Sequence, residues 1–182
     1  MGKIRRPERV KLFASLIFQD TVDLGEILGR LAPAIGPVEY QTPPALFTHT
    51  TYYNEEMGEG LKRCFVLFSP VFERDKLPGV KIATNEIEDQ FARDGRRAVN
   101  IDAGYIALEH VILATTKGYA HRLYIGKGIH ADLTLMFNNG SFRALEWTYP
   151  DYAEPETIAL FNKWRESVKQ ALKEFRRGPV KL

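Results

Sequence analysis

The first third of the chain alternates between a continuous apolar run and an amphipathic segment. Residues 10–18 are almost uniformly hydrophobic, which is typical of a strand covered on both faces. Apolar positions across residues 24–31 then recur at helical spacing, after two candidate N-caps, Asp20 and Thr21. Pro33 is expected to end this helix.

The middle of the chain continues with further strands and one more helix. In the second helix, residues 80–93, Thr84 is a candidate N-terminal cap for the residues from Glu86 onward. Gly95, just after this helix, is a candidate C-terminal cap. The order β-α-β-β-α-β is that of a ferredoxin-like split βαβ unit. The segments expected to be extended are 38–42, 47–53, 61–71 and 99–108, and the helix is 80–93.

The last third reads as an antiparallel hairpin sheet followed by one long helix. Asn139-Gly140 is a strong two-residue hairpin signal, and an amphipathic helix starts near Pro155. We therefore predict a single α+β domain over residues 1–182: a ferredoxin-like half, a hairpin sheet and a C-terminal helix. The tail, about 178–182, is expected to be frayed.

Composition restricts the classes of function. The 182 residues include 25 basic and 23 acidic side chains, so the net charge of +2 gives no global field for nucleic acid or membrane. The single cysteine, Cys64, excludes disulfide frameworks and multi-cysteine metal sites. No apolar run approaches the roughly 18 residues of a membrane span. These features predict a soluble cytoplasmic protein without a membrane partner, and they leave its oligomeric state open.

Polar residues within the predicted strand 99–108 are the best candidates for a site. Asn100 and Asp102 are two residues apart, so they share one face, and Gly104 leaves space beside them. A solvated sheet face or a local hydrogen-bonded pair explains them equally well. Asp102 with Asn100 suits a hard cation such as Mg²⁺, although two ligands alone do not identify a metal.

Basic side chains nearby suggest an anion site. Arg97, Lys117 and Arg122 can converge on phosphate or carboxylate oxygens, although taken singly each reads better as an exposed turn charge. The 81–88 segment adds polar groups at a helix start, and Tyr149 can stack on a ring or pack. The full set of candidate ligand-binding residues is Arg97, Asn100, Asp102, Tyr105, Lys117, His121, Arg122, Lys81, Asn85, Glu88 and Tyr149; the catalytic residues are unknown.

Common catalytic and nucleotide-binding motifs are absent from the sequence. There is no G-x-x-x-x-G-K-[ST] loop, no G-x-G-x-x-G, no G-x-S-x-G and no H-E-x-x-H. His49 opens one H-x-[ST] pattern of the kind that two-histidine phosphoesterases use in pairs, but the other histidines lack it. Glu55 and Glu56, beside two tyrosines, offer carboxylates, although such turns are usually just solvated.

Six short motifs together resemble an uncharacterised prokaryotic family. They are VKLF-x₂-LI near the start, T-x-YY-x-x-EMG at 50–58, KIATNEIE at 81–88, RRAVNIDAGY at 96–105, ATTK-x₃-HR-x-Y at 114–124 and EWTYPDY at 146–152. The combination is similar to domain-of-unknown-function family 4416 (DUF4416), along almost the whole chain. Some members of that family are labelled GTP-binding, but this sequence has neither a phosphate loop nor an N-K-x-D tetrapeptide. It also has Ala103 where the family often has Pro.

The sequence therefore favours a protein that binds a phosphate-bearing ligand, either a nucleotide such as GTP or an RNA segment, in a polar pocket on the sheet. It leaves open whether the protein is an enzyme. Any reaction would be phosphoryl or phosphodiester transfer with Mg²⁺ assistance. The competing hypothesis is a non-enzymatic adaptor or assembly module that acts through a sheet edge or the aromatic loop.

Overall fold

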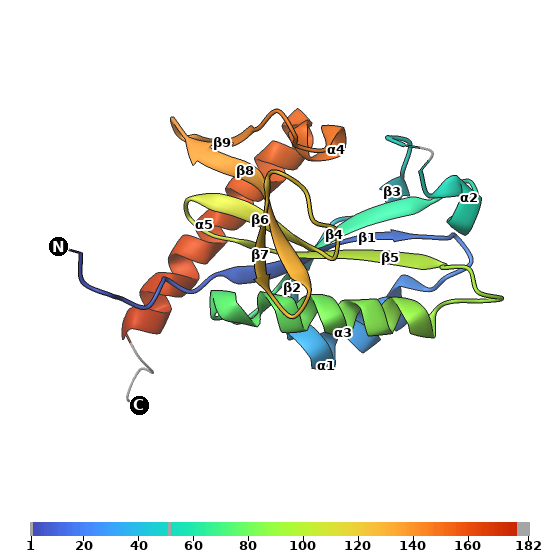
Figure 1. Cartoon of the computed structure of the whole chain (residues 1–182), viewed down its shortest axis with the longest axis horizontal. Helices are drawn as coiled ribbons and strands as arrows, with labels where there is room; N and C mark the ends of the chain where they lie inside the picture. Colours follow the sequence, from blue (N-terminus) through green and yellow to red (C-terminus); the bar gives the residue numbers. More distant parts are fainter. Residues whose placement is uncertain (1, 51, 178–182) are drawn as a thin grey trace.

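The computed structural model describes residues 2–50 and 52–177 (Figure 1). Its strands are β1 (Lys11–Phe18), β2 (Val38–Gln41), β3 (Ala45–Leu46), β4 (Lys62–Phe68), β5 (Val99–Ile106), β6 (His110–Thr115), β7 (Arg122–Gly126), β8 (Ile129–Asn138) and β9 (Ser141–Ala144). Its helices are α1 (Leu24–Ile35), α2 (Asn54–Met57), α3 (Leu77–Gln90), α4 (Pro150–Ala153) and α5 (Pro155–Arg177), with a 3₁₀ turn η1 (Arg74–Lys76). The predicted frayed tail at 178–182 lies outside the described residues.

The described strands form one open, fully antiparallel sheet of nine strands. Its main path runs β2-β4-β1-β5-β6-β8-β7, with β3 added beside β4 and β9 beside β8. The mixed α+β class predicted from the sequence is therefore confirmed. Every residue of β1 is buried, as its continuous apolar run predicts.

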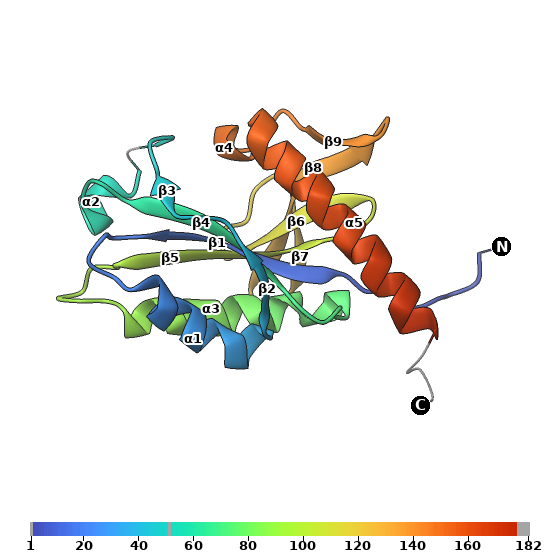
Figure 2. The ribbon, with the colours of Figure 1, turned by 180° about the vertical axis from the view of Figure 1, so that it is seen from behind.

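Helices cover both faces of this sheet. α1 and α3 lie side by side on one face, where Ile27 and Leu31 of α1 are fully buried against alternate residues of β1 such as Leu12 (Figure 1). α5 runs obliquely across the other face, where Phe161 and Trp164 pack against Phe13 (Figure 2). Adjacent β1 residues thus face opposite cores, one under α1 and α3 and the other under α5.

The boundaries of α1 differ from the predicted ones. Its N-cap is Asp23, whose carboxylate accepts a hydrogen bond from the Gly25 backbone N–H (3.1 Å), so both Asp20 and Thr21 were wrong. Pro33 lies inside the helix, which continues to Ile35. Proline removes only one hydrogen bond, and in the last turn this loss is tolerated because few residues follow it.

α3 starts earlier than predicted and ends earlier. Pro78 in its first turn suits a helix start, so Thr84 is not a cap. Thr84 instead lies buried in the middle, and its hydroxyl donates to the Lys81 carbonyl (2.9 Å). The helix ends at Gln90, and Gly95 (φ +72°) belongs to a separate tight turn rather than to a helix cap.

The predicted extended segment at 47–53 was also wrong. Strand pairing stops after the short β3, and α2 follows from Asn54. Phe47 and Tyr53 pack with Met57 in a small apolar cluster at one end of the sheet. Phe47 and Tyr53 are aromatic residues that favour strands, but here they pack against Met57 and hold the two ends of the loop together.

Candidate functional site

The site begins where two neighbouring strands separate. β5 pairs with β1 along its whole length but with β6 at only three positions, ending with Gly104 opposite Leu113. A Cβ atom at Gly104 would lie 2.3 Å from the Ile112 carbonyl oxygen and 2.8 Å from the Phe13 ring, so this close crossing requires glycine. The room that Gly104 provides is thus filled by protein, and the opening lies further along, towards Val99.

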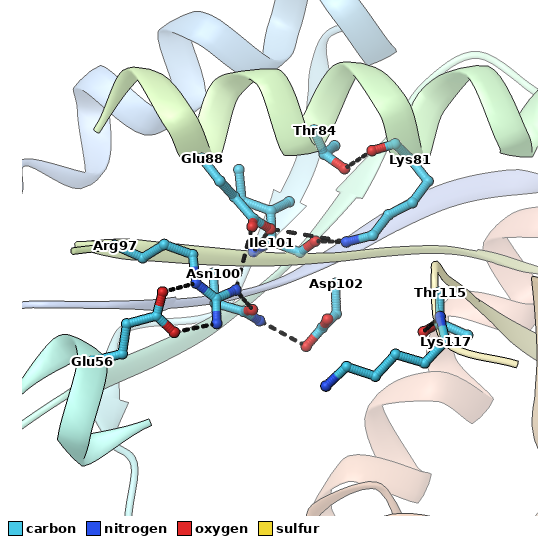
Figure 3. Close-up of polar contacts among 10 residues, drawn as sticks. All are labelled: Glu56, Lys81, Thr84, Glu88, Arg97, Asn100, Ile101, Asp102, Thr115 and Lys117. Atoms are coloured by element: carbon cyan, nitrogen blue, oxygen red, sulfur yellow. Dashed lines mark hydrogen bonds and ion pairs between the residues drawn. The ribbon is translucent and has the colours of Figure 1, made fainter. Parts of the chain in front are cut away.

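Side chains of α3 replace the missing strand at the edge of β5. The Ile101 backbone N–H donates to Glu88 Oε1 (2.7 Å), and Lys81 Nζ donates to the Ile101 carbonyl oxygen (2.8 Å) (Figure 3). Both side chains are more than 90% buried. Because buried backbone groups need partners, this arrangement lets β5 end its pairing with β6 without leaving Ile101 unsatisfied.

A cavity of about 830 Å³ occupies the opening between the strands. Its walls come from α3, β5, the end of β6, the connection into β7, residues 47–53 (Thr51 aside) and residues 149–152. Segments far apart in the sequence thus contribute to one concave surface. Its volume lies in the usual range for small-molecule sites.

Arg97 stands at one end of the cavity, in a network of hydrogen bonds. Its Nε and Nη2 donate to the two carboxylate oxygens of Glu56 (2.7 and 2.6 Å), and Nη1 donates to Asn100 Oδ1 (3.0 Å). Asn100 in turn donates from Nδ2 to Asp102 Oδ2 (3.0 Å). The hydrogen bonds with Glu56 raise the pKa of Arg97 and lower that of Glu56, so both groups are charged.

Lys117 approaches from the opposite wall. Its side chain extends towards Asp102 (Figure 3), and its Nζ donates to Tyr52 Oη (3.0 Å). This hydrogen bond and the ammonium charge lower the pKa of the Tyr52 phenol. Both side chains are exposed, so they lie at the mouth of the cavity.

Arg122 is tied to its surroundings on three sides. Its Nε donates to Asp132 Oδ2 (2.8 Å), its Nη1 to the Lys117 carbonyl oxygen (3.2 Å) and its Nη2 to Tyr149 Oη (2.9 Å). Asp132 is buried, and its charge is balanced by this guanidinium. Arg122 therefore mainly fixes the position of Lys117 and Tyr149.

The carboxylate of Glu88 has an unusual environment. Burial raises its pKa, while Lys81 (3.8 Å) and the Ile101 N–H lower it without cancelling the effect. Asp102 is only partly buried. Among the cavity's carboxylates Glu88 is therefore structural, whereas Asp102 can reach a ligand.

Nine of the eleven predicted ligand-binding residues line this cavity. The other two do not: Tyr105 lies on the opposite face of β5, with its hydroxyl 3.1 Å from His110 Nε2, and His121 stacks on Trp147 at a ring separation of 5.0 Å. The nine that line the cavity are Arg97, Asn100, Asp102, Lys117, Arg122, Lys81, Asn85, Glu88 and Tyr149.

A second polar group, absent from the predicted site residues, lies beneath the cavity. Arg63 of β4 is buried; its Nε donates to Ser15 Oγ (3.0 Å), its Nη1 pairs with Asp151, and its guanidinium lies 4.1 Å from the centre of the Phe65 ring. The one available signal was an arginine within an otherwise apolar strand, because a buried charge requires a partner. Tyr152, which also lines the cavity, lies beside this group.

Two further expectations concern histidine and metal chemistry. His49 lines the cavity, and its Nδ1 lies 3.5 Å from Glu154 Oε1, so it links the two loops at the mouth. Within the described ranges, no three His, Cys, Asp or Glu side chains gather in a way that would hold a metal ion. Asp102 is thus a single candidate ligand rather than part of a protein metal cage.

Comparisons with known proteins identify a family but no activity. The model of a family described as a domain of unknown function, DUF4416, matches residues 8–168. No curated protein and no solved structure matches the chain. Across residues 2–50 and 52–177, no helix has both the length and the apolar character needed to span a membrane.

Proposed function

We propose that this chain, which belongs to the DUF4416 family, binds a small phosphate-bearing molecule, a nucleotide such as GTP, in the cavity between β5 and β6. The volume of about 830 Å³ suits a mononucleotide better than an RNA segment, which would need a groove that continues along the surface. Binding of the nucleotide alone is therefore favoured over binding of RNA.

The observation that carries this proposal is the position of Lys117. Lys81, Arg97 and Arg122 each pair with a carboxylate, whereas among the described residues no carboxylate lies within ion-pair distance of Lys117. An ammonium at the mouth of a cavity, held by a tyrosine, is suited to a phosphate group. The anion contact predicted for three basic residues is thus assigned chiefly to Lys117.

Asp102 would contact the sugar or its counter-ion. Asn100 Nδ2 donates to Asp102 Oδ2, which leaves Oδ1 to accept a hydrogen bond from a ribose hydroxyl. If Mg²⁺ accompanies the phosphates, Asp102 would supply one ligand while phosphate and water oxygens supply the rest, because Mg²⁺ usually retains such ligands. A reaction at this site would be metal-assisted phosphoryl or phosphodiester transfer.

Tyr52 and Tyr149 would hold the base. Their rings are 62% and 47% exposed at the mouth, and their hydroxyls are fixed by Lys117 and Arg122. Exposed aromatic rings held in place offer stacking surfaces that tolerate any base.

A thermal-shift titration tests the proposal. GTP, ATP, UTP and pyrophosphate, each with and without Mg²⁺, should raise the melting temperature of the wild-type protein if the site binds them. Lys117→Met should move the titration to much higher nucleotide concentration, whereas Lys173→Met, a change of an exposed lysine on α5, should leave it in place. An unchanged melting temperature with every nucleotide would refute the proposed function.

A second candidate function rests on the edge strand β7. Leu123, Tyr124 and Ile125 are 73%, 65% and 36% exposed in succession, although sheet edges usually carry charges that discourage pairing. This surface suits an adaptor that adds a partner strand. Leu123→Lys should then abolish binding of the partner while leaving nucleotide shifts intact.

Two further parts of the prediction stay proposals. A ferredoxin-like unit of β1, α1, β2, β4, α3 and β5 is supported by the strand order β2-β4-β1-β5 and by two helices on one face. A cytoplasmic location is supported by the single buried cysteine.

A further inference from the structure

The bidentate contact between Arg97 and Glu56 has the geometry of a bound anion. Two parallel N–H groups of Arg97 meet the two oxygens of one carboxylate at 2.7 and 2.6 Å. A phosphate presents its oxygens to the same fork in the same way. Arg97 lines the cavity and Glu56 does not, so the fork lies at the edge of the cavity beside α2, where a ligand that extends to this edge would meet it.

Arg97 does not need Glu56 to stay in place. Its third nitrogen, Nη1, donates to Asn100 Oδ1 (3.0 Å) and lies 3.5 Å from Glu88 Oε2. Asn100 and Glu88 are buried side chains of β5 and α3. The outward fork would therefore keep its position if Glu56 left it.

α2 likewise has anchors that are independent of this ion pair. Met57 is buried in the cluster with Phe47 and Ile17, and its carbonyl oxygen accepts a hydrogen bond from Gln19 Nε2 (2.7 Å). The Glu56 side chain itself is 39% exposed. An ion pair with such exposure contributes little, so its exchange for a more highly charged group costs little.

From these contacts we infer that the Glu56 carboxylate occupies the position on Arg97 that the ligand's anion takes. The anion displaces Glu56 from Arg97 when the ligand binds in the cavity. The inference rests on the proposed function and extends it: Arg97 becomes a second anion contact that is masked in the unliganded protein. A polyphosphate then fits better than a monophosphate, because Lys117 and Arg97 lie on different walls of the cavity. Affinity is set by competition between the ligand and Glu56.

Inorganic pyrophosphate is the probe, because it carries the anion without a base or sugar. Its dissociation constant is measured by isothermal titration calorimetry at fixed ionic strength for the wild type, Glu56→Gln and Glu55→Gln. Glu55 is an exposed residue of the same turn, so its substitution matches the charge change without touching Arg97. We expect Glu56→Gln to bind about fivefold more tightly and Glu55→Gln to match the wild type.

A second pair of variants separates displacement from general electrostatics. In an Arg97→Met background, adding Glu56→Gln should not change the affinity, because the masked fork is gone. The inference would be overturned if Glu55→Gln bound pyrophosphate as much more tightly as Glu56→Gln does. It would also be overturned if Glu56→Gln bound pyrophosphate no more tightly than the wild type does. The comparison of these two variants with the wild type is sufficient even if Arg97→Met does not fold. Absence of pyrophosphate binding in every variant would also overturn it, while a GTP shift in the wild type would leave the proposed function standing.

Discussion

The edge of β5 should depend on one buried carboxylate. Glu88→Ala removes the acceptor of the Ile101 N–H and the partner of the Lys81 ammonium. An orphaned buried donor costs about 1–3 kcal/mol, and loss of a buried ionic partner about 3–5 kcal/mol. The lower end of the second range applies, because the Lys81–Glu88 distance is 3.8 Å and Lys81 keeps its bond to the Ile101 carbonyl. Relief of the burial cost of Glu88 offsets part of the sum, which leaves a net loss of about 3 kcal/mol.

Urea unfolding followed by tryptophan fluorescence measures this loss. Glu88→Gln keeps an acceptor for the Ile101 N–H, so it should cost only about 1 kcal/mol. The control is Glu86→Ala on the exposed side of the same helix, which should be close to neutral. If Glu88→Ala destabilises the protein no more than Glu86→Ala does, α3 does not replace a strand at this edge of β5.

Three further predictions concern titration, ligand binding and thiol reactivity. Because burial raises the pKa of Glu88, the folded state holds the carboxyl proton more tightly than the unfolded state does. The stability that this carboxyl contributes should therefore fall as pH rises above the ordinary carboxyl pKa of about 4.5. The difference in unfolding free energy between the wild type and Glu88→Gln, measured from pH 4 to 8, should show this fall. In calorimetry, Lys117→Met should weaken nucleotide binding about 10- to 100-fold, which is the contribution of a charge-assisted hydrogen bond. The same substitution should raise the pKa of Tyr52, measured by ultraviolet titration as the difference from Tyr52→Phe. An unchanged titration curve would contradict the hydrogen bond between Lys117 and Tyr52. Burial raises the pKa of Cys64 to about 12, so an aromatic disulfide reagent at pH 8 should modify it only in denaturant; rapid reaction of the native protein would contradict its burial.

The sequence predicted those parts of the fold that depend on local periodicity. The two-residue period of β5 correctly placed Asn100 and Asp102 on one face and Ile101 in the core of the other. The Asn139-Gly140 turn correctly predicted the β8–β9 hairpin, because its backbone preference needs no distant partner. Local pattern therefore predicted which face of a strand is buried and where this hairpin turns, but not the caps of α1 and α3.

The pairing of charged groups could not be predicted in the same way. Arg97 and Glu56 are 41 residues apart, and Arg63 and Asp151 are 88 apart, so nothing near either arginine indicates its partner. The sequence showed three cations that can meet an anion, whereas the structure pairs two of them with carboxylates and leaves the contact to Lys117. Which charges remain available is a property of tertiary contacts.

The most direct test of a nucleotide site at the separation of β5 and β6 is a crystal structure of the protein soaked with GTP and Mg²⁺. We expect density in the cavity, with phosphate oxygens within hydrogen-bond distance of Lys117 Nζ and a ribose hydroxyl or Mg²⁺ at Asp102. An empty cavity in a crystal that binds GTP elsewhere, or that does not bind it at all, would contradict a nucleotide site between β5 and β6.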